Sequence, residues 1–212
     1  MRHEFVLFDL DGTLSDPLVG FARSVNYALS HMGYAPLEMS QLATYIGPPL
    51  DSTFRAVTGE DSPAQTKEFV IKYRERYAEV GYSENTLYPG IEKALSHLRE
   101  SGIPLGVCTS KRRDFAERIL DMFGLRSHFR FVDGGEIGVQ KWQQIEALLA
   151  RKGIPPSTVM VGDRSVDLIA AHRNHLPAAG VLWGHGSRAE LEAEAPRYLL
   201  SLPNEIQTLV EG

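Results

Sequence analysis

The sequence predicts an α/β protein, a doubly wound parallel sheet with a small all-helical domain inserted after its first strand. Five short apolar runs recur along the chain at wide spacing, as buried parallel strands do. Segments in which apolar residues recur every three or four positions lie between the later runs. Roughly a hundred residues separate the first two runs, far more than the dozen or so that a crossover needs.

The strands and helices of the sheet domain can be assigned in order. The expected strands are residues 5–8, 105–108, 129–132, 159–161 and 179–182. The expected helices are residues 91–100, 114–123, 142–152 and 166–173. Alternation of strands and helices favours a parallel sheet covered by helices on both faces.

The long interval after the first strand predicts the inserted domain. Its expected helices cover residues 19–31, 40–45, 50–56 and 64–80. Glycine and proline clusters such as Gly47-Pro48-Pro49 separate them, as interhelix turns do. We therefore expect a helical cap over residues 17–84 and an α/β core formed by residues 1–16 and 85–212.

Composition limits the classes of function. The 212-residue chain has a formal net charge of -5, which argues against a protein that binds a nucleic-acid polymer, because such proteins carry a basic face. The single cysteine, Cys108, lies in an apolar run and excludes an intrachain disulfide, so a reducing compartment is expected. No apolar run has the length of a signal peptide or membrane span. We expect a cytoplasmic protein that does not bind membranes.

Polar clusters follow three of the expected strands. They are Asp9-Leu10-Asp11-Gly12-Thr13, Thr109-Ser110-Lys111 and Gly162-Asp163-Arg164-Ser165-Val166-Asp167. The carboxyl ends of parallel strands meet at one edge of a sheet, where ligands bind. Carboxylates gathered there need a cation, because like charges raise one another's pKa. Mg²⁺ suits the four expected oxygen ligands better than zinc does: Asp9, Asp11, Asp163 and Asp167. Helix capping is the alternative role for Asp163 and Asp167.

The first cluster, directly after an apolar strand, resembles the signature of the haloacid dehalogenase superfamily phosphatases. The resemblance extends to Thr109 ending the second strand, to Lys141 opening a helix, and to Gly162-Asp163 with Asp167 after the fourth strand. It covers nearly the whole chain. It implies a Rossmann-like core whose strand order is the last, the fourth, the first, the second and then the third.

The resemblance also implies a reaction, the Mg²⁺-dependent hydrolysis of a small phosphate monoester. Asp9 is the expected nucleophile, forming an aspartyl-phosphate, and Asp11 the expected general acid and base. Lys141 and Thr109 complete the expected catalytic group. The expected phosphate-binding residues are Gly12, Thr109, Ser110 and Lys141, with the backbone amides of Asp11, Gly12 and Ser110 as donors.

One departure concerns the lysine. Relatives often have proline after it, whereas Trp142 follows Lys141 here. Lys111 is the competing candidate, although its place directly after the second strand suits the rim of the site. A helix-start surface lysine is the alternative reading of Lys141.

Two loops bear on the substrate, which the cap should select. Residues 45–50 resemble a cap loop of the branch that contains 5′-nucleotidases and phosphoglycolate phosphatases, although a plain turn has the same composition. Trp183-Gly184-His185-Gly186 resembles the phosphoglycolate phosphatase branch. The cap loop and the missing proline favour nucleoside 5′-monophosphates over phosphoglycolate. A phosphosugar mutase and a non-catalytic phosphate-binding module remain alternatives, and the chain is expected to be a monomer or a homodimer.

Overall fold

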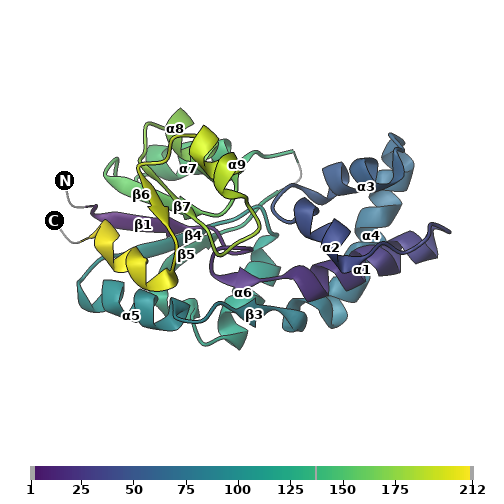
Figure 1. Cartoon of the computed structure of the whole chain (residues 1–212), viewed down its shortest axis with the longest axis horizontal. Coiled ribbons are helices and arrows are strands. Elements are labelled where there is room, and N and C mark those ends of the chain that lie inside the picture. The colour runs from purple at the N-terminus through teal and green to yellow at the C-terminus, as the bar shows by residue number, and fades with distance from the viewer. Residues whose placement is uncertain (1–2, 137, 211–212) are drawn as a thin grey trace. The chain divides into compact units, whose positions relative to one another are not determined.

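The computed structural model describes residues 3–136 and 138–210. The chain divides into two compact units (Figure 1). The first, here the core unit, contains Met1–Asp16 and Leu87–Gly212. The second, here the helical unit, contains Pro17–Thr86.

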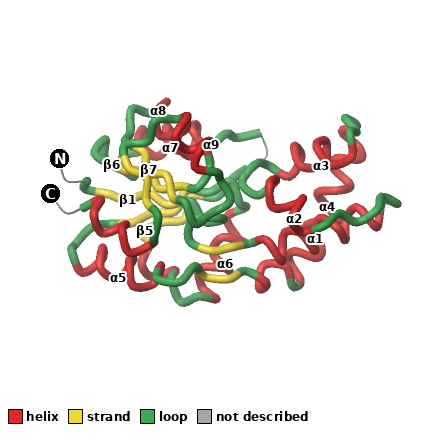
Figure 2. The backbone as a smooth tube through the Cα atoms, in the orientation of Figure 1, coloured by secondary structure: helices red, strands yellow, loops and turns green. Residues whose placement is uncertain are grey.

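A parallel sheet of six strands lies at the centre of the core unit (Figure 2). Its order is β5 (Phe129–Asp133), β4 (Leu105–Cys108), β1 (Phe5–Phe8), β6 (Thr158–Gly162), β7 (Ala178–Val181) and β8 (Tyr198–Leu200). Val6 of β1 lies opposite Leu105 of β4 and Val159 of β6. The five predicted strands and their order are confirmed. β8 adds an edge strand that the sequence analysis does not predict.

Helices cover both faces of this sheet (Figure 1). α5 (Ile91–Glu100) and α6 (Arg113–Met122) lie on one face, and α7 (Lys141–Ala150) and α8 (Ser165–Arg173) on the other. Phe5 and Leu7 pack in one cluster with Ile145 and Leu168, whereas their neighbour Val6 is buried outside that cluster. Successive strand residues point to opposite faces, so a sheet covered on both faces needs continuous apolar strands. The predicted doubly wound α/β fold is confirmed.

The remaining elements of the core unit are short. They are η3 (Arg126–His128), α9 (Arg188–Ala193) and η4 (Pro203–Leu209). Ser187 caps α9, because its hydroxyl oxygen accepts a hydrogen bond from the Glu190 amide at 3.1 Å. β2 (Ser15–Asp16) pairs with β3 (Thr86–Leu87) where the chain passes between the units.

The helical unit has its own apolar centre. Its elements are α1 (Leu18–His31), α2 (Met39–Leu42), η1 (Ala43–Tyr45), α3 (Leu50–Thr58), α4 (Pro63–Glu79) and η2 (Gly81–Glu84). The rings of Phe54 and Phe69 lie 5.1 Å apart between α3 and α4. Gly59 ends α3 in the left-handed conformation that glycine favours, and Pro63 opens α4 at a position where a helix tolerates proline. Within the described residues, none of the helices combines the length and apolarity that crossing a membrane requires.

Candidate active site

The backbone turns sharply where β1 ends. The Asp9 amide still donates to the Val161 carbonyl of β6 at 2.9 Å. Gly12 then has φ +83°, a conformation that residues with a Cβ rarely adopt. A Cβ at Gly12 would lie 2.1 Å from Oδ2 of Asp163. The absence of a side chain therefore lets the first polar cluster meet the third.

The amide of Gly12 is already engaged. It donates to the Ser15 carbonyl at 2.8 Å and closes the turn. The structure thus supports a role for Gly12 in shaping the turn and making room for Asp163, where the sequence analysis expects its amide to bind phosphate.

Three buried carboxylates meet at the carboxyl edge of the sheet. Asp9 follows β1, Asp163 follows β6, and Asp167 lies in the first turn of α8. One oxygen from each lies within 4.8 Å of the others. Oδ1 of Asp9 is buried and has no hydrogen-bond partner within the described parts of the chain. Asp11, the fourth expected metal ligand, does not belong to this group.

Lys141, the first residue of α7, faces two of these carboxylates. Its Nζ lies 3.0 Å from Oδ2 of Asp9 and also contacts Oδ1 of Asp167. The side chain is buried, although the positive end of a helix disfavours a cation there. Burial lowers the pKa of Lys141, but Asp167 and Asp9 outweigh that effect and raise it above its ordinary value. Lys141 is thus held as an ammonium inside the site.

One ammonium does not balance three carboxylates. Burial, together with the neighbouring charges of Asp167 and Asp9, raises the pKa of Asp163 to about 7. Burial also raises the pKa of Asp167 to about 6, against the opposing effect of Lys141. Together with the unpartnered oxygen of Asp9, this excess of negative charge fits a divalent cation. Oxygen ligands suit Mg²⁺ in particular.

Backbone amides and a hydroxyl group hold the carboxylates of Asp163 and Asp167 in place. Thr13 Oγ1 donates to Oδ1 of Asp163 at 3.1 Å, and the His185 amide donates to Oδ2 of Asp163 at 2.9 Å. The Arg164 amide donates to Oδ2 of Asp167 at 3.1 Å. Supporting hydrogen bonds of this kind orient metal-binding carboxylates.

Asp11 has a separate partner. Nζ of Lys111 lies 2.7 Å from Oδ2 of Asp11, and the Lys111 side chain is only 8% exposed. The expected rim position of Lys111 is therefore wrong, because the loop after β4 turns the side chain inward. Burial raises the pKa of Asp11, and Lys111 partly opposes that shift. A carboxyl group with a raised pKa is suited to giving and taking a proton.

The loop after β4 is held by residues that the sequence analysis does not single out. Gln144 Nε2 donates to the Thr109 carbonyl at 3.3 Å and to Oδ1 of Asp133 at 3.0 Å. The Gly135 amide donates to the Lys111 carbonyl at 2.8 Å. Gln144 could have been found from its place one helical turn after Lys141, on the same helix face.

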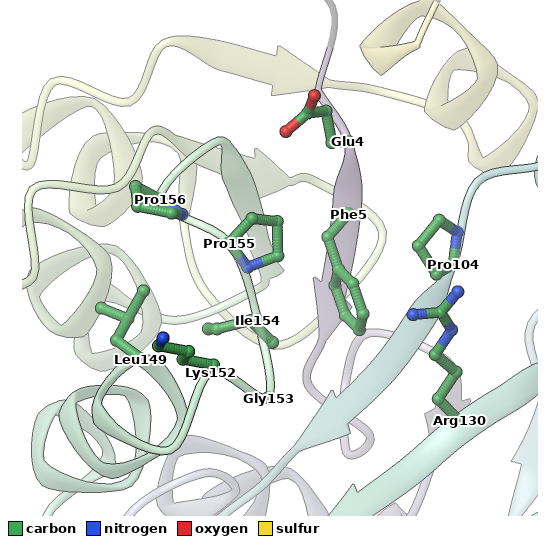
Figure 3. A pocket seen from close by; sticks show the side chains of 10 residues that line it. All are labelled: Glu4, Phe5, Pro104, Arg130, Leu149, Lys152, Gly153, Ile154, Pro155 and Pro156. Atoms are coloured by element: carbon green, nitrogen blue, oxygen red, sulfur yellow. The ribbon is translucent and has the colours of Figure 1, made fainter.

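The opposite edge of the sheet carries a hollow of about 570 Å³ (Figure 3). Phe5 opens β1, Pro104 precedes β4 and Pro156 lies before β6, and all three line it. The strands are parallel, so their amino ends lie at this edge and the carboxylates at the other. This hollow is therefore separate from the candidate active site.

Comparison with known proteins identifies the family. The profile of the haloacid dehalogenase-like hydrolases matches residues 6–181, a range that contains the carboxylates and lysines described above. The chain belongs to the haloacid dehalogenase-like hydrolase family. The expectation drawn from the first polar cluster is confirmed.

Several proteins with named activities are similar in sequence to this hydrolase. The 5′-nucleotidase of Pseudomonas aeruginosa is 39% identical over 202 residues, 93% of this chain and 91% of the relative. The tyrosine-protein kinase PtkA of Mycobacterium tuberculosis is 38% identical over 86% of this chain, a match that spans 63% of that protein. The phosphoglycolate phosphatase of Chromobacterium violaceum is 33% identical over 89% of each chain.

A solved structure shows the same fold throughout. A protein from Clostridium acetobutylicum described as a predicted phosphatase matches the hydrolase with a TM-score of 0.93 and 33% identity, covering 100% of both chains. The family match and the named phosphatases among its relatives identify the chain as a phosphoric monoester hydrolase.

Proposed function

We propose that this hydrolase requires Mg²⁺, forms an aspartyl-phosphate on Asp9, and acts on nucleoside 5′-monophosphates. The observation that carries the proposal is the Lys141 ammonium between Asp9 and Asp167. A buried carboxylate can act as a nucleophile only while it is ionised, and an adjoining buried cation keeps it so.

Asp9, Asp163 and Asp167 would hold the Mg²⁺ ion, because their oxygens already lie together. The bound ion would neutralise negative charge on the phosphoryl group during its transfer. The Asp11 carboxylate pairs with Lys111 instead. We therefore assign that carboxylate to proton transfer.

The reaction takes two displacements. In the first, an Asp9 oxygen bonds to phosphorus, the bond to the leaving oxygen breaks, and Asp11 donates its proton to that oxygen. In the second, Asp11 takes a proton from water as the water oxygen bonds to phosphorus, and the bond to Asp9 breaks. Inorganic phosphate leaves, and both aspartates return to their starting states.

Lys141, Thr109 and Ser110 would bind the phosphoryl oxygens during both steps. Thr109 is buried and directly precedes Ser110. Its carbonyl is fixed by a hydrogen bond from the Gln144 side chain. Charge-assisted and hydroxyl donors that are fixed before the substrate arrives stabilise the transferred group most effectively.

We further propose that residues 17–84 act as the cap that selects the leaving group. Four of the six lysine and arginine side chains of the helical unit form ion pairs with its own carboxylates: Arg23 and Arg76 with Glu84, Arg55 with Asp61, and Lys72 with Glu75. A cap in which most cations are already paired is suited to an uncharged nucleoside. Phosphoglycolate would bring a second anionic group that calls for a further cation.

The similarity to a 5′-nucleotidase over 93% of the chain also supports a nucleotide substrate. The alternative with direct support is a phosphoglycolate phosphatase, because such an enzyme is 33% identical over 89% of the chain. The kinase name of the mycobacterial relative makes ATP a necessary member of any substrate panel.

The test is phosphate release with Mg²⁺ across nucleoside 5′-monophosphates, phosphoglycolate, sugar phosphates and ATP. Wild type is compared with Asp9→Asn and with Asp121→Asn, which changes an exposed carboxylate of α6. We expect the highest kcat/KM for a nucleoside 5′-monophosphate, loss of turnover by several orders of magnitude in Asp9→Asn, and no loss in Asp121→Asn. Metal-dependent turnover by Asp9→Asn would exclude the covalent mechanism.

Two other results would redirect the proposal. A preference for phosphoglycolate would overturn the substrate while leaving the chemistry in place. If no substrate of the panel releases phosphate, a phosphosugar mutase or a non-catalytic phosphate-binding module would be favoured.

Asp11→Asn separates the two displacements. With p-nitrophenyl phosphate, whose leaving group needs no proton, the variant should still form the phosphoenzyme and release one p-nitrophenolate per chain. Turnover after this burst should be slower than in wild type by roughly 10²–10⁴-fold, because the water then lacks its base. Stopped-flow absorbance measures both phases, and equal loss in both would contradict the assignment.

A further inference from the structure

The Trp183–Gly186 loop follows β7 and has no part in the proposed chemistry. Its composition resembles that of the phosphoglycolate phosphatase branch. The structure places it against the carboxylate group instead. Its contacts reach the first polar cluster and Asp163, both at the carboxyl edge of the sheet.

Two glycines allow the loop this approach. A Cβ at Gly184 would lie 2.3 Å from Cβ of Asp163 and 2.3 Å from the Gly12 carbonyl oxygen. A Cβ at Gly186 would lie 1.9 Å from the Asp163 carbonyl oxygen. Contacts this short leave no room for any side chain at either position. Glycines have the greatest backbone freedom, however, so the loop needs anchors to stay in place.

Two side chains supply those anchors. Trp183 Nε1 donates to the Thr13 carbonyl at 3.0 Å. His185 Nε2 donates to Oδ1 of Asp16 at 3.1 Å, and the His185 side chain is 11% exposed. Asp16 is the last residue of the core unit before the helical unit begins. Between these anchors, the His185 amide donates to Oδ2 of Asp163.

We infer that His185 is a positioning residue for the metal site, acting through the loop. Its imidazole, held by Asp16, keeps its own backbone amide on the Asp163 carboxylate. Without that anchor, a residue between two glycines would sample many conformations, and Asp163 would lose a fixed hydrogen bond. The inference rests on the proposal that Asp163 helps to hold Mg²⁺.

The experiment measures the Mg²⁺ dissociation constant by calorimetry, in the full chain without substrate. The variants are His185→Ala, which removes the anchor, His185→Gln, which keeps an N–H donor, and Asp16→Ala, which removes the acceptor. His172→Ala, at an exposed position of α8, is the matched control. Asp163→Ala reports whether the site binds the ion at all.

We expect His185→Ala and Asp16→Ala each to weaken Mg²⁺ binding by about tenfold, the lower end of what such supporting contacts contribute. The double variant should bind no more weakly than either single one, because both changes break the same hydrogen bond. His185→Gln should recover most of the affinity, and His172→Ala should match wild type. At saturating Mg²⁺, kcat should return towards the wild-type value.

Unchanged Mg²⁺ affinity in His185→Ala, with binding lost in Asp163→Ala, would overturn this inference and leave the proposed function intact. Wild type that binds no Mg²⁺ would overturn both. Additive losses in the double variant would also overturn it, because His185 would then act independently of Asp16. If His185→Ala does not fold, Asp16→Ala carries the test, since it leaves the loop residues unchanged.

Discussion

At Gly12 and Asp163, the missing side chain of one residue makes room for the carboxylate of the other. The position of Gly12 requires a left-handed backbone, and it also requires empty space on the side facing Asp163. These two requirements are independent, and the chain contains another glycine position that imposes only the backbone requirement. Gly33 has the same φ of +83°, and a Cβ there would meet nothing within 4 Å.

The pair allows a controlled prediction. Gly12→Ala and Gly33→Ala both place a Cβ on a left-handed backbone, which costs about 1–3 kcal/mol. Only Gly12→Ala adds a collision with Asp163, so we expect it to lose more stability and to abolish Mg²⁺ binding, while Gly33→Ala keeps wild-type affinity. Thermal unfolding and calorimetry measure the two effects. Equal Mg²⁺ affinity in both variants would contradict the packing argument.

Among the site residues, those that follow strand ends were the most predictable. Asp9 and Asp163 had to lie at one edge once their strands were assigned as parallel neighbours. Lys111 was misplaced, because the direction of a side chain in a loop depends on distant contacts, here those of Gly135 and Asp11. The anchoring role of His185 depends on Asp16, far away in the sequence, and no local pattern reports it.

At the scale of elements, α7 organises two parts of the site. Its first residue, Lys141, contacts the carboxylates of Asp9, which follows β1, and of Asp167, which lies in α8. One turn later, Gln144 donates hydrogen bonds to groups at the ends of β4 and β5. Helical periodicity places both side chains on one face. A single helix therefore fixes the cation and the phosphate-binding loop relative to each other.

Gln144 tests this arrangement. Gln144→Glu would aim an acceptor at two acceptors, the Thr109 carbonyl and the Asp133 carboxylate, whereas Gln144→Leu only removes the donor. We expect Gln144→Leu to lose about 1–3 kcal/mol of stability, and Gln144→Glu to lose more. Both should raise the inhibition constant of inorganic phosphate. Glu146→Gln, at an exposed position of the same helix, is the control and should leave both quantities unchanged.

The elements that sequence reasoning found and those it missed differ in burial. β1, β4 and β6 are buried along their whole length, and their continuous apolar runs were easy to assign. β8 spans only Tyr198–Leu200, with its first two residues partly exposed at the sheet edge. α9 has six residues, too few to repeat an apolar pattern. Short elements at the margin of a fold depend on tertiary contacts more than on their own pattern.

At the scale of the whole molecule, the charge of the site is coupled to folding. The pKa of Asp163, about 7, and that of Asp167, about 6, both lie above the ordinary value of 3.8. Between pH 4 and 7 the folded chain therefore binds more protons at these groups than the unfolded chain does. Stability from this source is present at the acidic end of that window and is lost as pH rises through the folded-state values.

Mg²⁺ should reverse this trend, because a bound cation favours the ionised carboxylates and displaces their protons. We expect the rise in melting temperature on adding Mg²⁺ to be small near pH 5 and to grow steadily towards pH 8. Circular dichroism melts with Mg²⁺ or with a chelator measure it. Asp163→Asn should flatten the pH dependence, since it removes the group with the higher of the two pKa values. If the rise in melting temperature caused by Mg²⁺ does not vary with pH, the ion binds without displacing protons. It would then bind away from these carboxylates.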